Sequence, residues 1–144
     1  MDTLVDIGTF VGFSAHALSC GGQHVARVIT YDVVDCIPRE QPFDARVERR
    51  IGDCVRDLHD FIGAPLIVLD VDPHDGRQEQ RIVDALRENG YRGIVLCDDI
   101  HLNDDMRRWW SGIGLKKLDV TRYGHWSGSG IIVFDESWID VIVA

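Results

Sequence analysis

Apolar residues follow two different spacings along the chain, one typical of strands and one typical of helices. The strand candidates are TLVDIG (3–8), ARVITYDV (26–33), ARVERRIGD (45–53), PLIVLDV (65–71) and GIVLCDD (93–99). The helix candidates are FSAHALSCGG (13–22), CVRDLHDFIG (54–63), GRQEQRIVDALRENGYR (76–92) and DDMRRWWSGIG (104–114). Strands that alternate with helices in this way predict a parallel sheet covered on both of its faces.

The end of the chain departs from that alternation. The segment LKKLDVTRYGHWSGSGIIVFDE (115–136) contains two strand-like runs joined by a Gly/Ser turn, which predicts an antiparallel hairpin at one sheet edge. The loop CIPREQPFD (36–44), between the second and third candidate strands, is too short for a full helix. Because no repeat, low-complexity segment or linker interrupts the pattern, we predict one α/β domain over residues 1–144.

Charge and cysteine usage restrict the partners and the compartment. A formal net charge of −9 argues against nucleic acid and against an anionic membrane surface, which both attract basic proteins. No apolar run approaches the roughly 18 residues that span a bilayer, and no signal-peptide pattern opens the chain. The cysteines are scattered without a C-x-x-C pair, so a reducing cytoplasm is the expected location. They are Cys20, Cys36, Cys54 and Cys97.

A glycine-containing loop follows the first candidate strand. In VDIGTFVGFSA (5–15), Gly8 and Gly12 permit a sharp turn or a close approach to a ligand, at the strand-to-helix junction where open α/β sheets bind ligands. Phe10 stands where the middle glycine of G-x-G-x-x-G would be, which counts against a dinucleotide. Asp32 closes the second strand, where an acid can accept hydrogen bonds from both ribose hydroxyls of an adenosine. A plain tight turn remains the alternative interpretation of the glycines.

These segments, with VITYDV, IGD, LIVLDVDPH and GIVLCDD, resemble class I S-adenosylmethionine (SAM)-dependent methyltransferases, in particular the small-molecule O-methyltransferases. The resemblance covers residues 4 to about 105. It implies a three-layer Rossmann-like methyltransferase fold, with a mostly parallel seven-stranded sheet and an antiparallel C-terminal hairpin edge. By the same resemblance, Asp6, Gly8 and Gly12 border the methionine part of the cofactor and Ser14 lies near it. Asp32 holds the ribose, and Asp53 lies beside the adenine.

Carboxylates end the two central candidate strands. Asp70 ends one and Asp98 and Asp99 end the other, so the three side chains are expected to converge if these strands are neighbours. Like charges so close raise one another's pKa unless a cation separates them, and hard oxygen ligands suit Mg²⁺ or Ca²⁺. In the catechol-type branch, the positions that resemble these three bind such a metal, which orients a substrate hydroxyl. Solvated loop acids are the alternative.

The predicted catalytic residues are His74 and Asp72, in the run D-V-D-P-H. The metal-dependent branch has a lysine where this chain has Pro73, and His74, one place later, is expected to take the hydroxyl proton. His101 and His125 are alternative bases.

We therefore expect methyl transfer from SAM to a hydroxyl of a small molecule, with a divalent metal as a candidate assistant. One alternative is a non-catalytic cofactor- or nucleotide-binding module, and another is metal-dependent phosphoryl transfer. The latter is weakened because the only lysines, Lys116 and Lys117, lie far along the chain from Asp70. Family members carry helices upstream of the first strand, and this sequence starts almost at that strand. A more open pocket, or a lid borrowed by forming a homodimer, is the resulting expectation.

Overall fold

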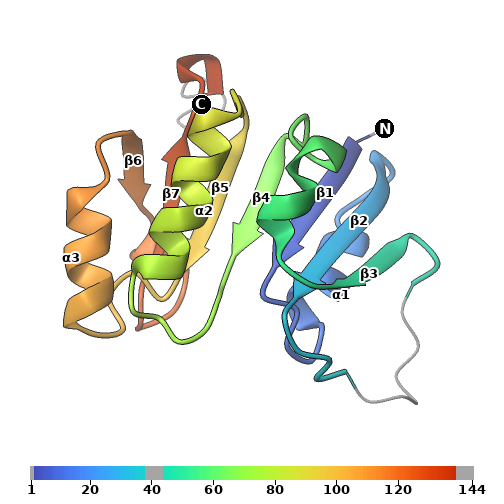
Figure 1. Ribbon diagram of the computed structural model, residues 1–144, viewed down its shortest axis with the longest axis horizontal. Coiled ribbons are helices and arrows are strands. Elements are labelled where there is room, and N and C mark those ends of the chain that lie inside the picture. The colour runs from blue at the N-terminus through green and yellow to red at the C-terminus, as the bar shows by residue number, and fades with distance from the viewer. Residues whose placement is uncertain (1, 38–43, 139–144) are drawn as a thin grey trace.

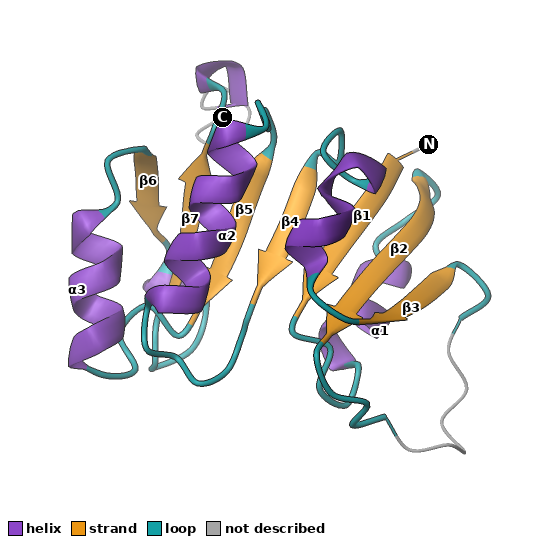
Figure 2. Cartoon of the chain, in the orientation of Figure 1, coloured by secondary structure: helices purple, strands orange, loops and turns teal. Residues whose placement is uncertain are grey.

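A computed structural model describes residues 2–37 and 44–138, which form one seven-stranded sheet with helices against it (Figures 1 and 2). The strands are β1 (Asp2–Ile7), β2 (Val25–Asp32), β3 (Val47–Ile51), β4 (Leu66–Leu69), β5 (Ile94–Asp98), β6 (Lys116–Asp119) and β7 (Ser129–Val133). The α-helices are α1 (Phe13–Ser19), α2 (Arg77–Glu88) and α3 (Asp104–Gly112). Three 3₁₀ helices complete the set, η1 (Cys54–Asp60), η2 (Thr121–Tyr123) and η3 (Glu136–Trp138).

The strand order is β3-β2-β1-β4-β5-β7-β6. The first five strands are mutually parallel, and β7 pairs antiparallel with both β5 and β6. The predicted fold class is therefore confirmed, including the antiparallel C-terminal hairpin. β7 occupies the place beside β5, and β6 forms the outer edge. Part of the predicted loop 36–44 lies outside the described residues, and its described ends contain no helix.

The two faces of the sheet are covered unequally. The face made by Val5, Ile67, Val95 and Ile132 has no exposed surface, because η1, α2 and α3 pack over it. α1 lies behind the sheet in Figure 1, over β1 and β2. The neighbouring apolar side chains of that second face are only half-buried; they are Leu66, Val68, Ile94, Leu96 and Ile131.

Two glycines leave room for Trp109 and Trp110, the adjacent tryptophans of α3. A Cβ on Gly130 of β7 would lie 2.5 Å from the Trp110 ring, and a Cβ on Gly76 would lie 2.6 Å from the Trp109 Cβ. Both tryptophans are buried, so α3 is held against β7 on one side and against the start of α2 on the other. Asn103 caps α3, because its side chain accepts a hydrogen bond from the Met106 N–H.

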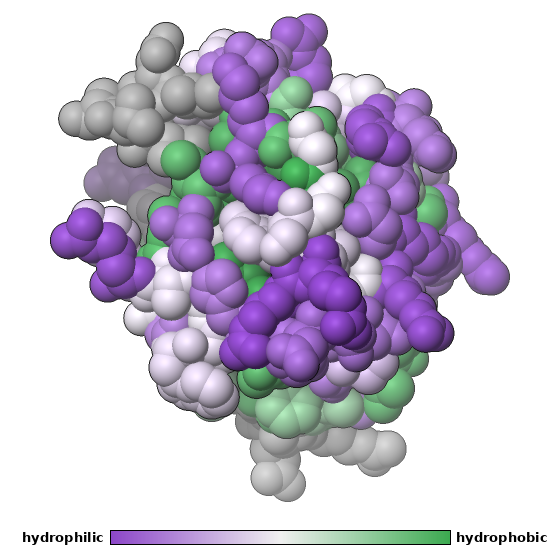
Figure 3. Space-filling view, turned by 90° about the vertical axis from the view of Figure 1, so that its left-hand side faces the viewer, coloured by the Kyte–Doolittle hydropathy of each residue, from purple (hydrophilic) through white to green (hydrophobic). Residues whose placement is uncertain are grey.

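The molecular surface and the cysteines agree with an ordinary globular domain. Figure 3 looks at the side that carries α3 and β6, where hydrophilic side chains predominate and hydrophobic residues show between them and along the lower edge. None of the described helices is long and apolar enough to cross a membrane. All four cysteines are free thiols, with Cys54 and Cys97 buried and Cys20 and Cys36 exposed.

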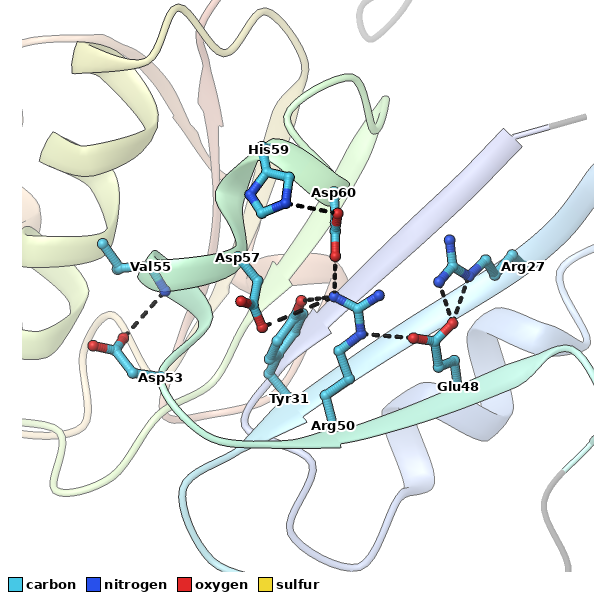
Figure 4. A network of polar contacts seen from close by, with 9 residues as sticks. All are labelled: Arg27, Tyr31, Glu48, Arg50, Asp53, Val55, Asp57, His59 and Asp60. Atoms are coloured by element: carbon cyan, nitrogen blue, oxygen red, sulfur yellow. Dashed lines mark hydrogen bonds and ion pairs between the residues drawn. The ribbon is translucent and has the colours of Figure 1, made fainter.

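A polar network centred on Arg50 ties β2 and β3 to η1 (Figure 4). Its guanidinium donates to Glu48 at 2.6 Å, to the Tyr31 hydroxyl at 2.6 Å and to Asp60 at 2.5 Å. It also lies 5.5 Å from the centre of the Tyr31 ring. Because η1 is short and irregular, with Asp57 outside helical geometry, these bonds fix its position beside the sheet.

We expect Arg50→Met to lower the free energy of unfolding by about 2 kcal/mol, because several hydrogen bonds to charged groups are lost together. Arg49→Met is the matched control: Arg49 pairs with Asp35 at the surface, and its loss should cost no more than about 0.5 kcal/mol. Urea denaturation of both variants measures the difference. Equal losses would show that the network does not stabilise the fold.

Candidate functional site

The predicted site residues gather at the carboxyl edge of the parallel strands, the lower edge of the sheet in Figure 1. β1 leads into the glycine loop at Gly8, β2 ends at Asp32, β4 leads into Asp70, and β5 ends at Asp98. Because β5 and β7 are antiparallel, the connection from β6 to β7 also comes to this edge, where Asp98 faces Ser129. Ligands of open α/β sheets bind at such an edge.

Gly8 follows β1 directly, and its backbone lies close to that of Asp70, the residue that follows β4. Its φ is +103°, and a Cβ there would lie 1.5 Å from the Asp70 carbonyl oxygen. The N–H of Gly8 donates to the Tyr31 carbonyl at 2.8 Å, which joins the loop to β2. Gly12 has φ 86° and precedes α1 as its N-cap. These glycines therefore make the turn and the close approach that the sequence predicts. The close approach is between Gly8 and the backbone of Asp70 and does not involve a ligand.

Asp32 holds the tip of the glycine loop. One carboxylate oxygen accepts the Phe10 N–H at 2.8 Å and the other accepts the Val34 N–H at 3.1 Å. Phe10 has φ +44°, a left-handed conformation that is uncommon for residues other than glycine. The Asp32 carboxylate thus supports a strained loop and presents its remaining lone pairs at the strand edge.

Asp6 is a fully buried carboxylic acid at the end of β1. Its Oδ2 accepts a hydrogen bond from Thr30 at 2.7 Å, and the Thr30 hydroxyl lies 2.6 Å from that of Thr9. Its Oδ1 has no hydrogen-bond partner among the described residues. Burial raises the pKa of Asp6 to about 6, although the hydroxyls of Thr30 and Ser14 act in the opposite direction. An unpartnered buried oxygen beside a ligand-binding edge is a candidate contact for a bound molecule.

Every strongly exposed large apolar or aromatic side chain of the described residues lies at this edge or in the connection that returns to it. They are Phe10, Phe13, Val33, Val34, Ile51, Tyr123 and Trp126. Phe10 and Val34 donate to Asp32, Val33 follows it and Ile51 lies opposite it on β3, whereas Tyr123 and Trp126 flank His125 in the β6–β7 connection. Phe13 begins α1, directly after the glycine loop. Apolar groups that gather at one exposed edge mark a binding surface.

Asp53 is already engaged by the protein. Its carboxylate caps η1 by accepting a hydrogen bond from the Val55 N–H at 3.1 Å, and it forms a bidentate ion pair with Arg81 of α2. The Arg81 hydrogen bonds hold the pKa of Asp53 below its usual range. Its predicted place beside an adenine stays a prediction, and the ion pair shows that Asp53 also fixes η1 to α2.

His74 lies at the centre of an acidic cluster that follows β4 and β5. Its Nε2 is 4.0 Å from Asp70 Oδ1, 3.4 Å from Asp72 Oδ1 and 3.6 Å from Asp99 Oδ2. The cis bond between Asp72 and Pro73, the φ of +55° at His74 and the φ of +58° at Asp99 shape the two loops that bring these groups together. Asn103 secures the arrangement, because its amide donates to the His74 carbonyl at 2.9 Å.

A second cluster shares Asp99 and includes Asp98 and His125. His125 Nε2 lies 3.1 Å from Asp98 Oδ2, and the Ser127 hydroxyl lies 2.5 Å from His125 Nδ1. Ser127 is buried, so its hydroxyl orients the imidazole and is not accessible as a nucleophile. The other candidate base, His101, is engaged with Asp119 at 2.7 Å.

The three predicted carboxylates, Asp70, Asp98 and Asp99, therefore lie at one edge of the sheet in two groups that share Asp99. Each group also contains a histidine. Burial, followed by the negative charge of Asp98, raises the pKa of Asp70. Among the described residues, no lysine or arginine pairs with any of the three carboxylates. A cluster of acids balanced only by histidines has the donor set of a cation site.

A separate groove of about 670 Å³ runs between α2 and α3. Three arginines line it, and each pairs with an aspartate of the protein: Arg77 with Asp75, Arg81 with Asp53, and Arg108 with Asp105. Since its charges are already matched, we place the functional site at the strand ends.

Comparison with solved structures shows what this chain is similar to in fold. The O-methyltransferase from Bacillus cereus in complex with SAH superposes with a TM-score of 0.65 at 16% identity, over 92% of this chain and 74% of that one. The O-methyltransferase TomG from Streptomyces achromogenes, involved in tomaymycin synthesis and in complex with SAM, gives 0.64 at 15% identity, over 92% and 73%. SAH-bound methyltransferase PaMTH1 from Podospora anserina gives 0.64 at 17%, over 94% and 72%. The chain has an O-methyltransferase fold. No family model matches the sequence, and no curated protein matches it.

Two features of the site could not be predicted from the sequence. The sequence offers His125 only as an alternative base, and its pairing with Asp98 depends on β7 lying beside β5. Glu79, in the first turn of α2, is buried without a side-chain hydrogen bond to either carboxylate oxygen, and its Oε1 lies 4.0 Å from His74 Nδ1. A glutamate in a polar first turn normally faces solvent, so no sequence signal marks it.

Proposed function

We propose that this protein transfers a methyl group from SAM to a hydroxyl of a small molecule at the carboxyl edge of its sheet. The observation that carries the proposal is the juxtaposition at one edge of the Gly8–Asp6–Asp32 region with the His74 cluster. The close approach of Gly8 to Asp70 brings the two halves together. The O-methyltransferase fold supports it.

The residues around the glycine loop fit an adenosyl and aminoacyl ligand. The Asp32 carboxylate suits two ribose hydroxyls, and the exposed apolar surface of Val33 and Ile51 suits an adenine ring. The unpartnered Asp6 Oδ1, near Ser14, suits the polar methionine end. Bound there, SAM supplies an electrophilic methyl group on a sulfonium sulfur.

The histidine-containing cluster fits the acceptor side. Asp70, Asp98, Asp99 and their histidines would hold a divalent cation, which supplies Lewis acidity that orients a hydroxyl and lowers its pKa. The exposed carboxylate of Asp72, which lies 3.4 Å from His74 Nε2, receives the hydroxyl proton when the cation is bound, and His74 receives it when no cation occupies Nε2. Tyr123 and Trp126 provide an exposed aromatic rim for an acceptor with an apolar body.

Calorimetric titration with SAM tests the proposal. We expect the wild type to bind and Asp32→Ala to lose affinity by about 10- to 100-fold, the value of hydrogen bonds to a charged group. Asp35→Ala is the matched control, because it removes the same charge from an exposed residue three positions away that pairs with Arg49. Its affinity should stay within about twofold of the wild type.

Turnover separates the proposal from its rival. Incubation with SAM and a panel of phenolic and aliphatic hydroxyl compounds should yield the demethylated cofactor and a methyl ether. SAM binding without turnover across the panel would favour the non-catalytic cofactor-binding module. No binding by folded wild type would overturn the methyltransferase proposal.

A further inference from the structure

We infer that the acidic cluster is a nitrogen-containing metal site in which His74 Nε2 is a ligand, and that it selects a transition-metal dication such as Zn²⁺ over Mg²⁺ or Ca²⁺. This deepens the cation part of the proposed function and rests on it. The ligand group is Asp70, His74 and Asp99, whose donor atoms all lie within 4.8 Å of one another.

The orientation of the His74 ring supports this assignment. Nε2 faces three carboxylates, and the side chain is only 18% exposed, so the ring is held in the cluster and is not a mobile surface group. None of those distances is a hydrogen bond. His74 Nε2 lies 4.0 Å from an Asp70 oxygen and 3.6 Å from an Asp99 oxygen, at ion-pair and not hydrogen-bond distance, which leaves room between them for an ion.

Glu79 provides an independent observation on the opposite side of the ring. It is 2% exposed, no side chain donates a hydrogen bond to either of its oxygens, and Oε1 lies 4.0 Å from His74 Nδ1. The backbone N–H groups of Gly76 and Glu79, at the start of α2, also interact with this carboxylate. A buried carboxylate that has no side-chain donor or cation beside it is costly. Metal-ligating histidines almost always donate their second N–H to a carboxylate or carbonyl, and Glu79 stands where that acceptor is needed. Glu79 is therefore a positioning residue for His74.

The donor set determines the choice of metal. Mg²⁺ and Ca²⁺ prefer oxygen ligands throughout, whereas imidazole suits zinc and other transition metals. The three aspartates alone predict an oxygen-only set. The structure instead adds an imidazole to each of the two groups around Asp99, His74 to one and His125 to the other.

Metal titration of the metal-free protein tests this inference without any methyl acceptor. Every protein in this titration, the reference included, carries Cys20→Ser and Cys36→Ser, because these exposed thiols are alternative zinc ligands. The Cys20 Sγ also lies 3.9 Å from His16 Nε2. We expect Zn²⁺ to bind at least about tenfold more tightly than Mg²⁺. His74→Asn, which tolerates the left-handed backbone at this position, should weaken Zn²⁺ binding by about 10- to 100-fold and leave Mg²⁺ binding little changed.

Glu79→Gln should weaken Zn²⁺ binding by about tenfold, since it removes the charged acceptor while keeping the shape. His59→Asn is the control: its imidazole also lies beside an aspartate, Asp60, but on η1, and its loss should leave Zn²⁺ affinity unchanged. Nitrogen NMR of histidine-labelled protein gives a readout that needs no variant, because Zn²⁺ should shift the His74 Nε2 resonance.

Equal affinity for Mg²⁺ and Zn²⁺, an unaltered Zn²⁺ affinity in His74→Asn, or an unshifted His74 nitrogen at saturating Zn²⁺ would each overturn the inference. SAM titration of the same preparations reports separately on the cofactor side. The metal site can therefore fail while the methyltransferase proposal stands, or the reverse.

Discussion

Gly8→Ala is expected to lower the free energy of unfolding by about 4 kcal/mol, or to prevent folding at 37 °C. Two causes act together. A Cβ at Gly8 would lie 1.5 Å from the Asp70 carbonyl oxygen, which belongs to the backbone and cannot move aside cheaply. The φ of +103° is also one that L-residues rarely adopt. Thermal and urea denaturation measure the loss.

Two other glycines separate these causes. Gly22 has φ +125° and nothing within 4 Å of the place where a Cβ would lie, so Gly22→Ala carries only the backbone strain, about 1 to 2 kcal/mol. Gly63 has neither a positive φ nor a neighbour, and Gly63→Ala should be neutral or slightly stabilising. If Gly8→Ala cost no more than Gly22→Ala, the close contact between β1 and β4 would not exist as described.

Gly8 illustrates which features of the site the sequence predicts and which it does not. A glycine after a strand predicts a turn or a close approach, and the sequence predicts both the fold class and the edge where the site forms. It does not identify the neighbouring group that comes close. That group is the carbonyl of Asp70, 62 positions along the chain, which becomes a neighbour because β1 pairs with β4.

The acidic ends of β4 and β5 were predictable for the same reason, because parallel strands end at one edge. The histidines were harder to place. His74 lies beside the carboxylates with a left-handed backbone conformation, directly after the cis bond between Asp72 and Pro73. His125 lies beside Asp98 because of the irregular connection between β6 and β7. Such loop geometry depends on local packing that neither hydrophobic period nor residue spacing encodes. Similarly, Asp53 follows β3 as expected, but its ion pair with Arg81 depends on how α2 packs beside η1.

Asp6→Asn is expected to make the protein more stable at pH 8 and to weaken its binding of SAM. Burial raises the pKa of Asp6 from 3.8 to about 6 in the folded state. Between these values the native state binds more protons than the unfolded state, so the free energy of unfolding falls as the pH rises. The Asp6 contribution is fully present below about pH 4 and lost above about pH 6. The shift corresponds to about 3 kcal/mol.

Asparagine avoids that loss because it cannot ionise, and its carbonyl can still accept the Thr30 hydroxyl. Its amide group needs partners of its own, which reduces the expected gain to about 1 to 2 kcal/mol at pH 8, with none at pH 4. Urea denaturation at the two pH values measures the difference. A stability difference that is the same at pH 4 and pH 8 would contradict the assignment of the penalty to the buried charge.

The predicted cost of Asp6 is informative about the site because the Thr30 and Ser14 hydroxyls compensate the buried charge only in part. Thr30 satisfies one oxygen, and Oδ1 remains without a partner among the described residues. A cationic or hydrogen-bonding ligand at the glycine loop would supply the missing interaction and favour the ionised form. SAM should therefore stabilise the wild type more than Asp6→Asn at pH 8, measured as the rise in melting temperature at saturating ligand. An equal rise in both proteins would remove Asp6 from the cofactor site while leaving its effect on stability intact.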